Sequence, residues 1–304
     1  RFARLAMRMP ETMHPDYVEA ILRAFGEAKP PNGATADWQP AEVAELNPVL
    51  LRFAAQLTDR GAALAAGWLF HNRCDEDWAV ESLQILASLA KDHPNPEGKD
   101  ATVHSGVSGD LEPDYVSTAI NCVRGVACEA IGAVIAQHPR QLPVLQPAIY
   151  AAEWDAHPAV RIAANRIALS LISIDRDEAI RFFLALASHS DDVVLRGAEF
   201  SHFLSYMLLP EFDRLGSLVK RMIRSARGKV AKSGAEWACL MYLHARKMND
   251  EVEECLSGTS DQAKGIAEVL ARELDEDRVD GTVQGWVQRL LNDERKDVRD
   301  TVAR

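Results

Sequence analysis

The sequence predicts an all-α protein built as an α-solenoid of stacked helical hairpins. Three observations lead to this fold class. Apolar residues recur at helical spacing through most of the chain, no series of alternating strands with tight turns is present, and a short pattern recurs about every 35 residues. With two helices in each period, we expect about 14–17 helices.

The segment 159–174 shows the helical periodicity most clearly. Its apolar residues recur four, three, four and three positions apart, so they share one face of a helix. These residues are Val160, Ala164, Ile167, Leu171 and Ile174. The segments 118–137 and 211–226 carry similar stripes, and 175–188 opens with an aspartate followed three residues later by a glutamate, an arrangement similar to a capping box. Each segment is predicted to be a helix that buries one face.

A basic residue followed closely by small residues recurs at the predicted helix starts. It occurs at Arg124, Arg161, Arg196, Lys232, Lys264 and Arg299. The successive separations are 37, 35, 36, 32 and 35 residues. One such period holds two helices and two short turns, which is typical of helical-hairpin arrays. The hairpins of such an array bury their apolar faces only by stacking on their neighbours.

Two of these periods share a longer pattern. In "DAHPAVRIAANR" and "NDERKDVRDTVAR", Asp155 and Asp293 are each followed after four residues by a Val-Arg pair, which contains Arg161 in the first stretch and Arg299 in the second. An aspartate can cap a helix or tie a turn, and an arginine can bridge turn groups while its stem covers apolar surface. We therefore interpret both pairs as structural repeat positions and not as catalytic groups.

The chain divides into three parts by composition. Residues 1–92 are predicted to form an N-terminal helical region and residues 117–304 a regular repeat array. The segment 93–116 is rich in Pro, Gly, Ser and charge and nearly free of large apolar residues, which indicates a long exposed loop or hinge. The chain begins with an arginine and ends on a repeat start, so we expect it to be a segment of a longer protein.

The pattern Asp-x4-Val-Arg at this period resembles HEAT-type helical repeats. In that family the aspartate and the arginine are structural and help to fix the turn between helices and its junction with the next unit. The resemblance implies a HEAT- or armadillo-like solenoid over about residues 117–304. Arg124 and Arg196 take the corresponding place in less complete copies, and Lys232 and Lys264 match only in spacing and in the small residues that follow.

A narrower resemblance concerns two longer stretches. "RFARLAMRMPETMHPDYVEAILRAF" (1–25) and "STAINCVRGVACEAIGAVIAQHP" (117–139) are similar to the C-terminal helical-repeat region of large bacterial STAND-type NTPases. Some of these proteins act in anti-phage defence, where a nucleotide-binding module drives oligomerisation and the C-terminal array senses a trigger. The resemblance implies a sensor array, and it carries over no ligand-binding residue.

No catalytic or cofactor motif is present in the sequence. Neither Gly-Lys pair has the first glycine and the following Ser or Thr that a phosphate-binding loop needs, and the patterns G-x-G-x-x-G, G-x-S-x-G, H-E-x-x-H and C-x-x-C do not occur. We therefore predict that the chain is not an enzyme and takes no cofactor or metal. The net charge of −11 argues against a general nucleic-acid-coating role.

The cysteines and the apolar runs indicate a cellular compartment. The five cysteines show no paired spacing, and the N-terminus lacks the apolar core and cleavage site of a signal peptide. No apolar run approaches the roughly 18–20 residues that span a bilayer. These observations predict free thiols in the cytoplasm and no membrane partner.

The densest basic segment is "LVKRMIRSARGKVAK", at 218–232. Lys220, Arg221, Arg224 and Arg227 have helical spacing within it and are candidate partner-binding residues. A solvated helix face near a helix C-terminus would explain them equally. If they do bind a partner, an acidic protein fits better than nucleic acid, because aromatic residues for base stacking are missing here.

His202 and Trp154 are two further candidates for partner contacts. His202 lies among aromatic residues in "EFSHFLSYM", and Trp154 directly precedes the Asp155 turn. A histidine can serve as a polar group in a groove, and tryptophan is favoured at interfaces. Either residue could equally be an ordinary structural one.

The sequence thus predicts a non-enzymatic protein-interaction or sensor array, with a trigger protein or its own NTPase module as partner. The alternative is a structural scaffold that packs on the protein's own motor or mediates oligomers. A third hypothesis is a helical-repeat nucleic-acid enzyme such as a base-excising glycosylase. That enzyme would need a catalytic carboxylate beside a basic, aromatic-bearing groove, which the sequence does not indicate.

Overall fold

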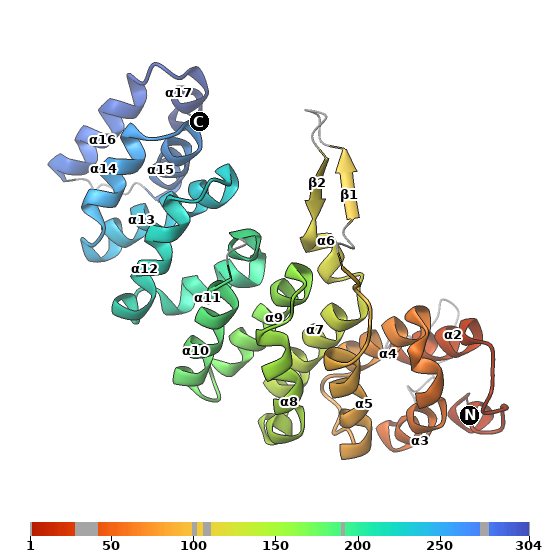
Figure 1. Cartoon of the computed structure of the whole chain (residues 1–304). Coiled ribbons are helices and arrows are strands. Elements are labelled where there is room, and N and C mark those ends of the chain that lie inside the picture. Colours follow the sequence, from red (N-terminus) through yellow and green to blue (C-terminus); the bar gives the residue numbers. More distant parts are fainter. Residues whose placement is uncertain are drawn as a thin grey trace, which may run out of the picture. The chain divides into compact units, whose positions relative to one another are not determined.

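The computed structural model describes residues 2–27, 42–98, 102–105, 111–189, 192–273 and 280–303. In these residues the chain forms 17 α-helices, three short 3-10 helices and two short strands (Figure 1). The predicted all-α class and the expected number of helices are both confirmed. No helix in these ranges combines the length and the apolar character needed to cross a membrane.

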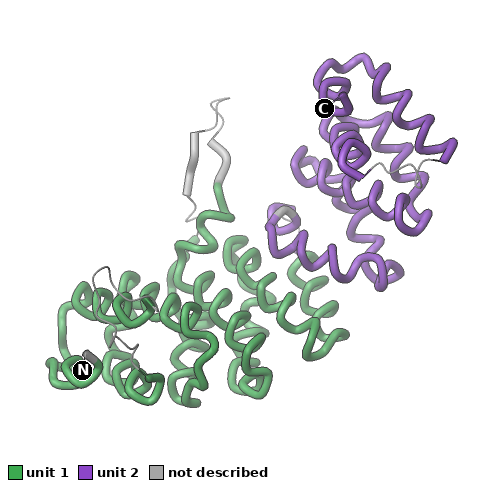
Figure 2. The backbone as a smooth tube through the Cα atoms, turned by 180° about the vertical axis from the view of Figure 1, so that it is seen from behind, with its two compact units in different colours: residues 1–188 green, residues 189–304 purple. Residues whose placement is uncertain are grey.

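The chain forms two compact units, residues 1–188 and residues 189–304 (Figure 2). The helices of unit 1 are α1 (Phe2–Ala6), α2 (Pro15–Gly26), α3 (Val43–Phe53), η1 (Ala54–Thr58), α4 (Arg60–Asn72), α5 (Val80–Lys91), α6 (Tyr115–Ala119), α7 (Val123–Gln137), η2 (Pro139–Gln141), α8 (Leu142–Glu153), α9 (Pro158–Leu171) and α10 (Arg176–Ala187). The helices of unit 2 are η3 (Asp192–Arg196), α11 (Ala198–Met207), α12 (Phe212–Ile223), α13 (Gly228–Ala245), α14 (Asn249–Ser257), α15 (Ser260–Glu273), α16 (Gly281–Leu291) and α17 (Lys296–Val302).

The helices of unit 1 lie in two layers. In one layer α2 packs on α4, α4 on α7 and α7 on α9; in the other, α3 packs on α5, α5 on α8 and α8 on α10 (Figure 1). Contacts between α4 and α5, α5 and α7, α8 and α9, and α9 and α10 join the layers. The α7 helix is therefore covered on several sides, and eleven of its fifteen residues are buried.

Local sequence signals set the helix starts in unit 1. The His157 side chain accepts a hydrogen bond from the Ala159 backbone N–H at the start of α9, with Pro158 at the first helical position. The Asp175 side chain accepts one from the Glu178 N–H at the start of α10, as the capping-box spacing predicts.

Unit 2 repeats the packing of alternate helices. The α13 helix packs on α15 and α15 packs on α17, while α12, α14 and α16 contact this row from outside it. A small residue permits the close approach of α13 and α15: a Cβ atom at Gly265 would lie 2.4 Å from the carbonyl oxygen of Lys232. Only glycine fits there without a shift of the backbone.

The boundary between the compact units lies at 188/189 and not at the predicted hinge, 93–116. Helices on both sides of 93–116 pack against one another, α4 and α5 before it against α7 and α8 after it. The predicted array of 117–304 is instead divided after α10. After this boundary the chain forms η3, a five-residue 3-10 helix, before the next α-helix begins.

The segment 93–116 also contains regular structure that its composition did not indicate. Strands β1 (Thr102–Ser105) and β2 (Leu111–Asp114) pair in antiparallel register, with Thr102 opposite Asp114. Asp114 then caps α6, because its carboxylate accepts a hydrogen bond from the Ser117 N–H.

Candidate functional site

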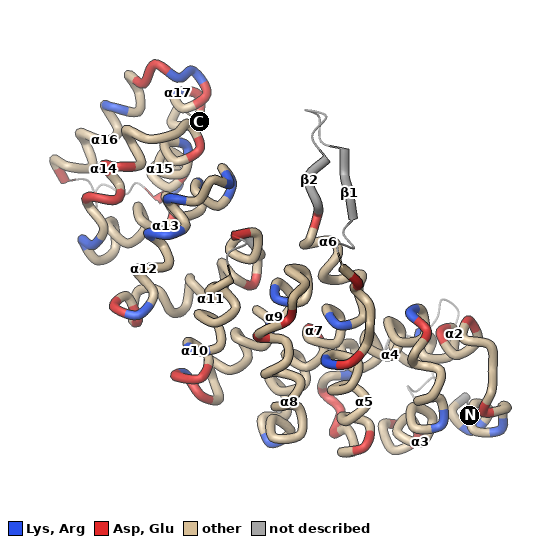
Figure 3. The backbone as a smooth tube through the Cα atoms, viewed as in Figure 1, with Lys and Arg blue, Asp and Glu red and all other residues tan. Residues whose placement is uncertain are grey.

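The basic segment at the end of α12 pairs with carboxylates of its own unit. Figure 3 marks the positions of the charged residues along the backbone. Lys220 Nζ lies 2.6 Å from Glu251, and Arg221 lies 2.6 Å from an oxygen of Asp192 while also donating to the His189 carbonyl. Arg224 lies 3.6 Å from Glu254. These pairs offset much of the positive charge that the sequence analysis assigned to partner binding.

The same segment lines an open hollow of about 520 Å³, which we call the α12 hollow. Its lining residues are Asp192, Ser217, Lys220, Arg221, Arg224, Ser225 and Ala226. The Ser225 hydroxyl donates to Asp192, so this carboxylate accepts hydrogen bonds from both Ser225 and Arg221. Arg227 is half-buried directly before α13, and its backbone N–H donates to the Ser225 hydroxyl. The hollow combines both signs of charge and is not a dedicated anion site.

The Asp155 turn joins α8 to α9 and to the preceding hairpin. Its carboxylate accepts hydrogen bonds from the His157 N–H at 2.8 Å and from the Arg124 guanidinium at 2.8 and 3.3 Å. Arg124 also donates to the His93 and Pro94 carbonyls, just after α5. The Arg161 side chain, 3% exposed, donates to the Asp155 carbonyl. One aspartate therefore ties two neighbouring helical pairs together.

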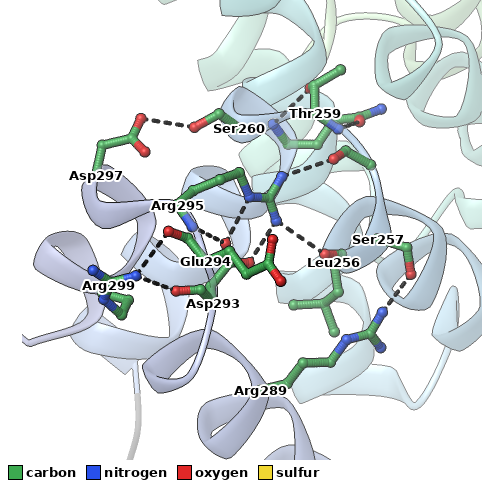
Figure 4. Close-up of polar contacts among 12 residues, drawn as sticks. Leu256, Ser257, Thr259, Ser260, Arg289, Asp293, Glu294, Arg295, Asp297 and Arg299 are labelled. Atoms are coloured by element: carbon green, nitrogen blue, oxygen red, sulfur yellow. Dashed lines mark hydrogen bonds and ion pairs between the residues drawn. The ribbon is translucent and has the colours of Figure 1, made fainter.

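The Asp293 turn in unit 2 repeats the local part of this arrangement (Figure 4). Its carboxylate accepts a hydrogen bond from the Arg295 N–H at 2.8 Å, and its carbonyl accepts one from Arg299. The Arg295 guanidinium donates two hydrogen bonds to the Asp293 carboxylate. It also donates to the carbonyls of Leu256 and Gly258 at the end of α14. A guanidinium at a helix C-terminus complements the partial negative charge of that end.

Two lysines of the repeat series bridge successive helices of the α13, α15 and α17 row. Lys232 of α13 lies 2.6 Å from Glu268 of α15, and Lys264 of α15 pairs with Asp297 of α17. The Ser260 hydroxyl also donates to Asp297. The lysine and the serine together lower the pKa of the Asp297 carboxyl from 3.8 to about 2.

The pairing across hairpins thus uses different residues in the two units. In unit 1, Arg124 pairs with the aspartate of the turn itself, Asp155. In unit 2, Asp293 binds Arg295 within its own turn, Arg295 also donates to carbonyls at the end of α14, and the ion pair between α15 and α17 joins Lys264 to Asp297. The shared sequence pattern therefore fixes the turn, whereas the bridging pair differs.

The remaining predicted positions lie apart from these turns. Arg196 ends η3 and does not begin an α-helix, and its side chain lies outside the described residues. His202 is exposed on α11. Trp154 follows α8 as its C-cap residue and is 64% exposed. Trp154 directly precedes the Asp155 turn, and His202 is not among the residues that line the α12 hollow.

An exposed apolar stripe on α8 was missed in the sequence analysis. Pro143, Pro147, Tyr150 and Trp154 are all exposed, and they recur four, three and four residues apart. The signal was available, because α8 contains no charged residue before Glu153 and its other apolar residues suffice for a buried face. We call these four residues the α8 stripe.

The cysteines of the chain are free thiols, and four of them are buried. Burial raises the pKa of Cys122 to about 11 and that of Cys255 to about 12, so both are protonated at neutral pH. A buried protonated thiol is a poor nucleophile. Within the described part of the chain, no group of three or more His, Cys, Asp and Glu side chains is arranged to hold a metal ion.

No protein-family model matches the chain, and no curated protein matches it in sequence.

Proposed function

We propose that the chain is a solenoid of stacked helical hairpins, of the kind that HEAT-type arrays form, and that it acts as a non-enzymatic protein-interaction or sensor array. The observation that carries this proposal is the bridging of successive hairpins by charged pairs, Arg124 with Asp155 in unit 1 and Lys264 with Asp297 in unit 2. Such bridges fit a repeating array in which each unit is stabilised by its neighbour.

The packing of alternate helices supports the same proposal. Successive helices such as α4, α7 and α9 pack side by side and together form an extended surface. Repeat proteins use surfaces of this kind to bind other proteins. The described residues, by contrast, show no metal-binding cluster, and the most perturbed cysteine thiols are buried. The proposed setting is a reducing cytoplasm, which the five free thiols fit.

The proposed context is a larger bacterial STAND-type NTPase of the defence type, in which this array would sense a trigger protein or contact the NTPase module. The stretches 1–25 and 117–139 support this part through the resemblance given above. The test is to delete the array from the full-length protein and to measure trigger-dependent activation. Loss of activation is expected, and retained activation would contradict the sensor proposal.

A structural scaffold is the competing function. The ion pairs that occupy Lys220 and Arg221 inside unit 2 favour it for the α12 surface, because these cations already have partners. Exchange of the array for that of a relative separates the two functions. If trigger specificity does not follow the exchanged array, the scaffold is the better explanation.

A further inference from the structure

The α8 stripe is not needed for the packing of α8. The opposite face of the helix supplies its buried residues, which include Leu145, Ala148, Ile149 and Ala152. Tyr150 is 46% exposed and Trp154 is 64% exposed. Within α8, Gln146 is the one exposed polar residue, and its Nε2 donates to the Tyr150 hydroxyl at 2.9 Å. Exposed helix faces normally carry charged or polar side chains, so a largely apolar face marks a surface for another molecule.

The surroundings of the stripe are acidic. Tyr150 lies next to Arg181 of α10, whose guanidinium carbon is 5.8 Å from the ring centre. That arginine is held by Glu153 of α8, at 2.8 and 2.9 Å, and by Glu178 of its own helix. Asp177 is exposed one residue before Glu178.

The local charge balance is negative. The end of α8, the Asp155 turn and the start of α10 contribute five carboxylates, Glu153, Asp155, Asp175, Asp177 and Glu178, against four guanidiniums, Arg124, Arg161, Arg176 and Arg181. One negative charge therefore remains in excess in this part of unit 1. A positively charged ligand is attracted to this surface, whereas phosphate groups of a nucleic acid or of an anionic lipid are repelled.

The contact between Arg181 and Tyr150 shows which side chain this surface accepts. A guanidinium lies over the tyrosine ring while carboxylates bind its nitrogen atoms. Trp154 is one helical turn further along the same face and is the stronger ring for a cation. A second arginine or lysine could therefore stack on Trp154 with carboxylates of α10 close by.

We infer that the α8 stripe is the docking surface for a basic segment of a partner protein, in which arginine or lysine side chains alternate with apolar ones. A cation of the segment stacks on Trp154, and its apolar side chains cover Tyr150, Pro143 and Pro147. This inference rests on the proposed function as a protein-interaction array and names the surface and the chemistry of the partner.

The test measures binding of a short fluorescent peptide of arginine, leucine and glycine to the full chain by fluorescence anisotropy. Its counterpart has glutamate in place of arginine. Trp154→Ala should weaken binding of the basic peptide about tenfold and Tyr150→Ala about threefold. Tyr206→Ala is the matched control, because Tyr206 is 68% exposed on α11 and lies outside the stripe. It should leave binding unchanged, and the glutamate peptide should not bind.

Equal losses in Trp154→Ala and Tyr206→Ala would show that the peptide binds the acidic chain non-specifically, and would overturn the inference. Binding of the glutamate peptide would overturn it as well. Sedimentation of the unmodified chain and of Trp154→Ala adds a further check. If the unmodified chain is an oligomer and Trp154→Ala is not, a second copy of the chain occupies the stripe, and the inference of a basic partner is wrong. If the array proves necessary for activation but Trp154→Ala binds the peptide normally, this inference fails and the proposed function stands.

Discussion

Arg124→Ala tests whether charged pairs between neighbouring helical pairs stabilise unit 1, as the proposed array requires. The side chains of Arg124 and Asp155 are only 14% and 11% exposed, and they meet through two hydrogen bonds. Removal of the arginine leaves the aspartate with the His157 N–H and leaves two backbone carbonyls, those of His93 and Pro94, without the guanidinium.

Breaking one partner of a buried ion pair costs about 3–5 kcal/mol. Because Asp155 keeps one backbone hydrogen bond and some exposure to water, we expect the lower end, about 3 kcal/mol. For a unit of this size that corresponds to a fall in melting temperature of about 6–12 °C. The loss should arise in unit 1, which contains both residues.

The assay is thermal and urea unfolding followed by circular dichroism, with hydrogen exchange to assign the loss to α7, α8 and α9. Arg140→Ala is the matched control, since Arg140 pairs with Asp77 on the surface of the same unit at 69% and 59% exposure. Such exposed pairs contribute about 0–1 kcal/mol. If Arg124→Ala and Arg140→Ala lower the stability by the same small amount, the bridge between hairpins does not stabilise the array.

Three further predictions concern Arg161, two glycines of unit 2 and Asp297. Arg161→Ala should destabilise unit 1 by about 2–3 kcal/mol, because the buried guanidinium donates to the Asp155 turn; loss of function at an unchanged melting temperature would instead give Arg161 a direct role. Gly265→Ala should destabilise unit 2 by about 1–3 kcal/mol, because the new Cβ clashes with α13. Gly285→Ala has nothing within 4 Å of its new Cβ and should stabilise unit 2 by about 0.5–1 kcal/mol. If both substitutions shift the urea midpoint of unfolding in the same direction, this reasoning is wrong. Because the pKa of Asp297 is lowered to about 2, its ion pair stabilises unit 2 above pH 4, and this stabilisation is lost as the pH falls from about 4 to about 2. Asp297→Asn should therefore make the stability of unit 2 depend less on pH between pH 4 and pH 2. An unchanged pH dependence of stability would exclude the effect.

Local features of the fold were predictable from the sequence because they depend on residues close in the chain. The Asp155 turn illustrates this: the aspartate accepts from the N–H two residues later, and Arg161 donates to a carbonyl six residues earlier. Asp293 and Arg299 share the same spacing and the same two contacts. Periodicity also predicted helices correctly, since each needs only one continuous apolar face.

Contacts between distant residues were less predictable. The carboxylate partners of Lys220 and Arg221 lie about 30 residues away on other elements, so the basic segment looked freer in the sequence than it is in the fold. The α8 stripe was missed for a related reason, because apolar residues such as Tyr150 are assigned to the core by default.

Trp154 and Asp155 are neighbours in the chain, yet they should affect different properties. Asp155 accepts hydrogen bonds from Arg124 of α7 and from the start of α9, so its loss acts on the contact between two hairpins. The Trp154 side chain is largely exposed at the end of α8, in the other layer. In the proposed array, the residues that stabilise the fold can therefore lie at the turns between layers, and the outer faces of the helices can vary with the proposed partner. Asp155→Ala should lower the melting temperature and Trp154→Ala should not, although the two substitutions are one residue apart.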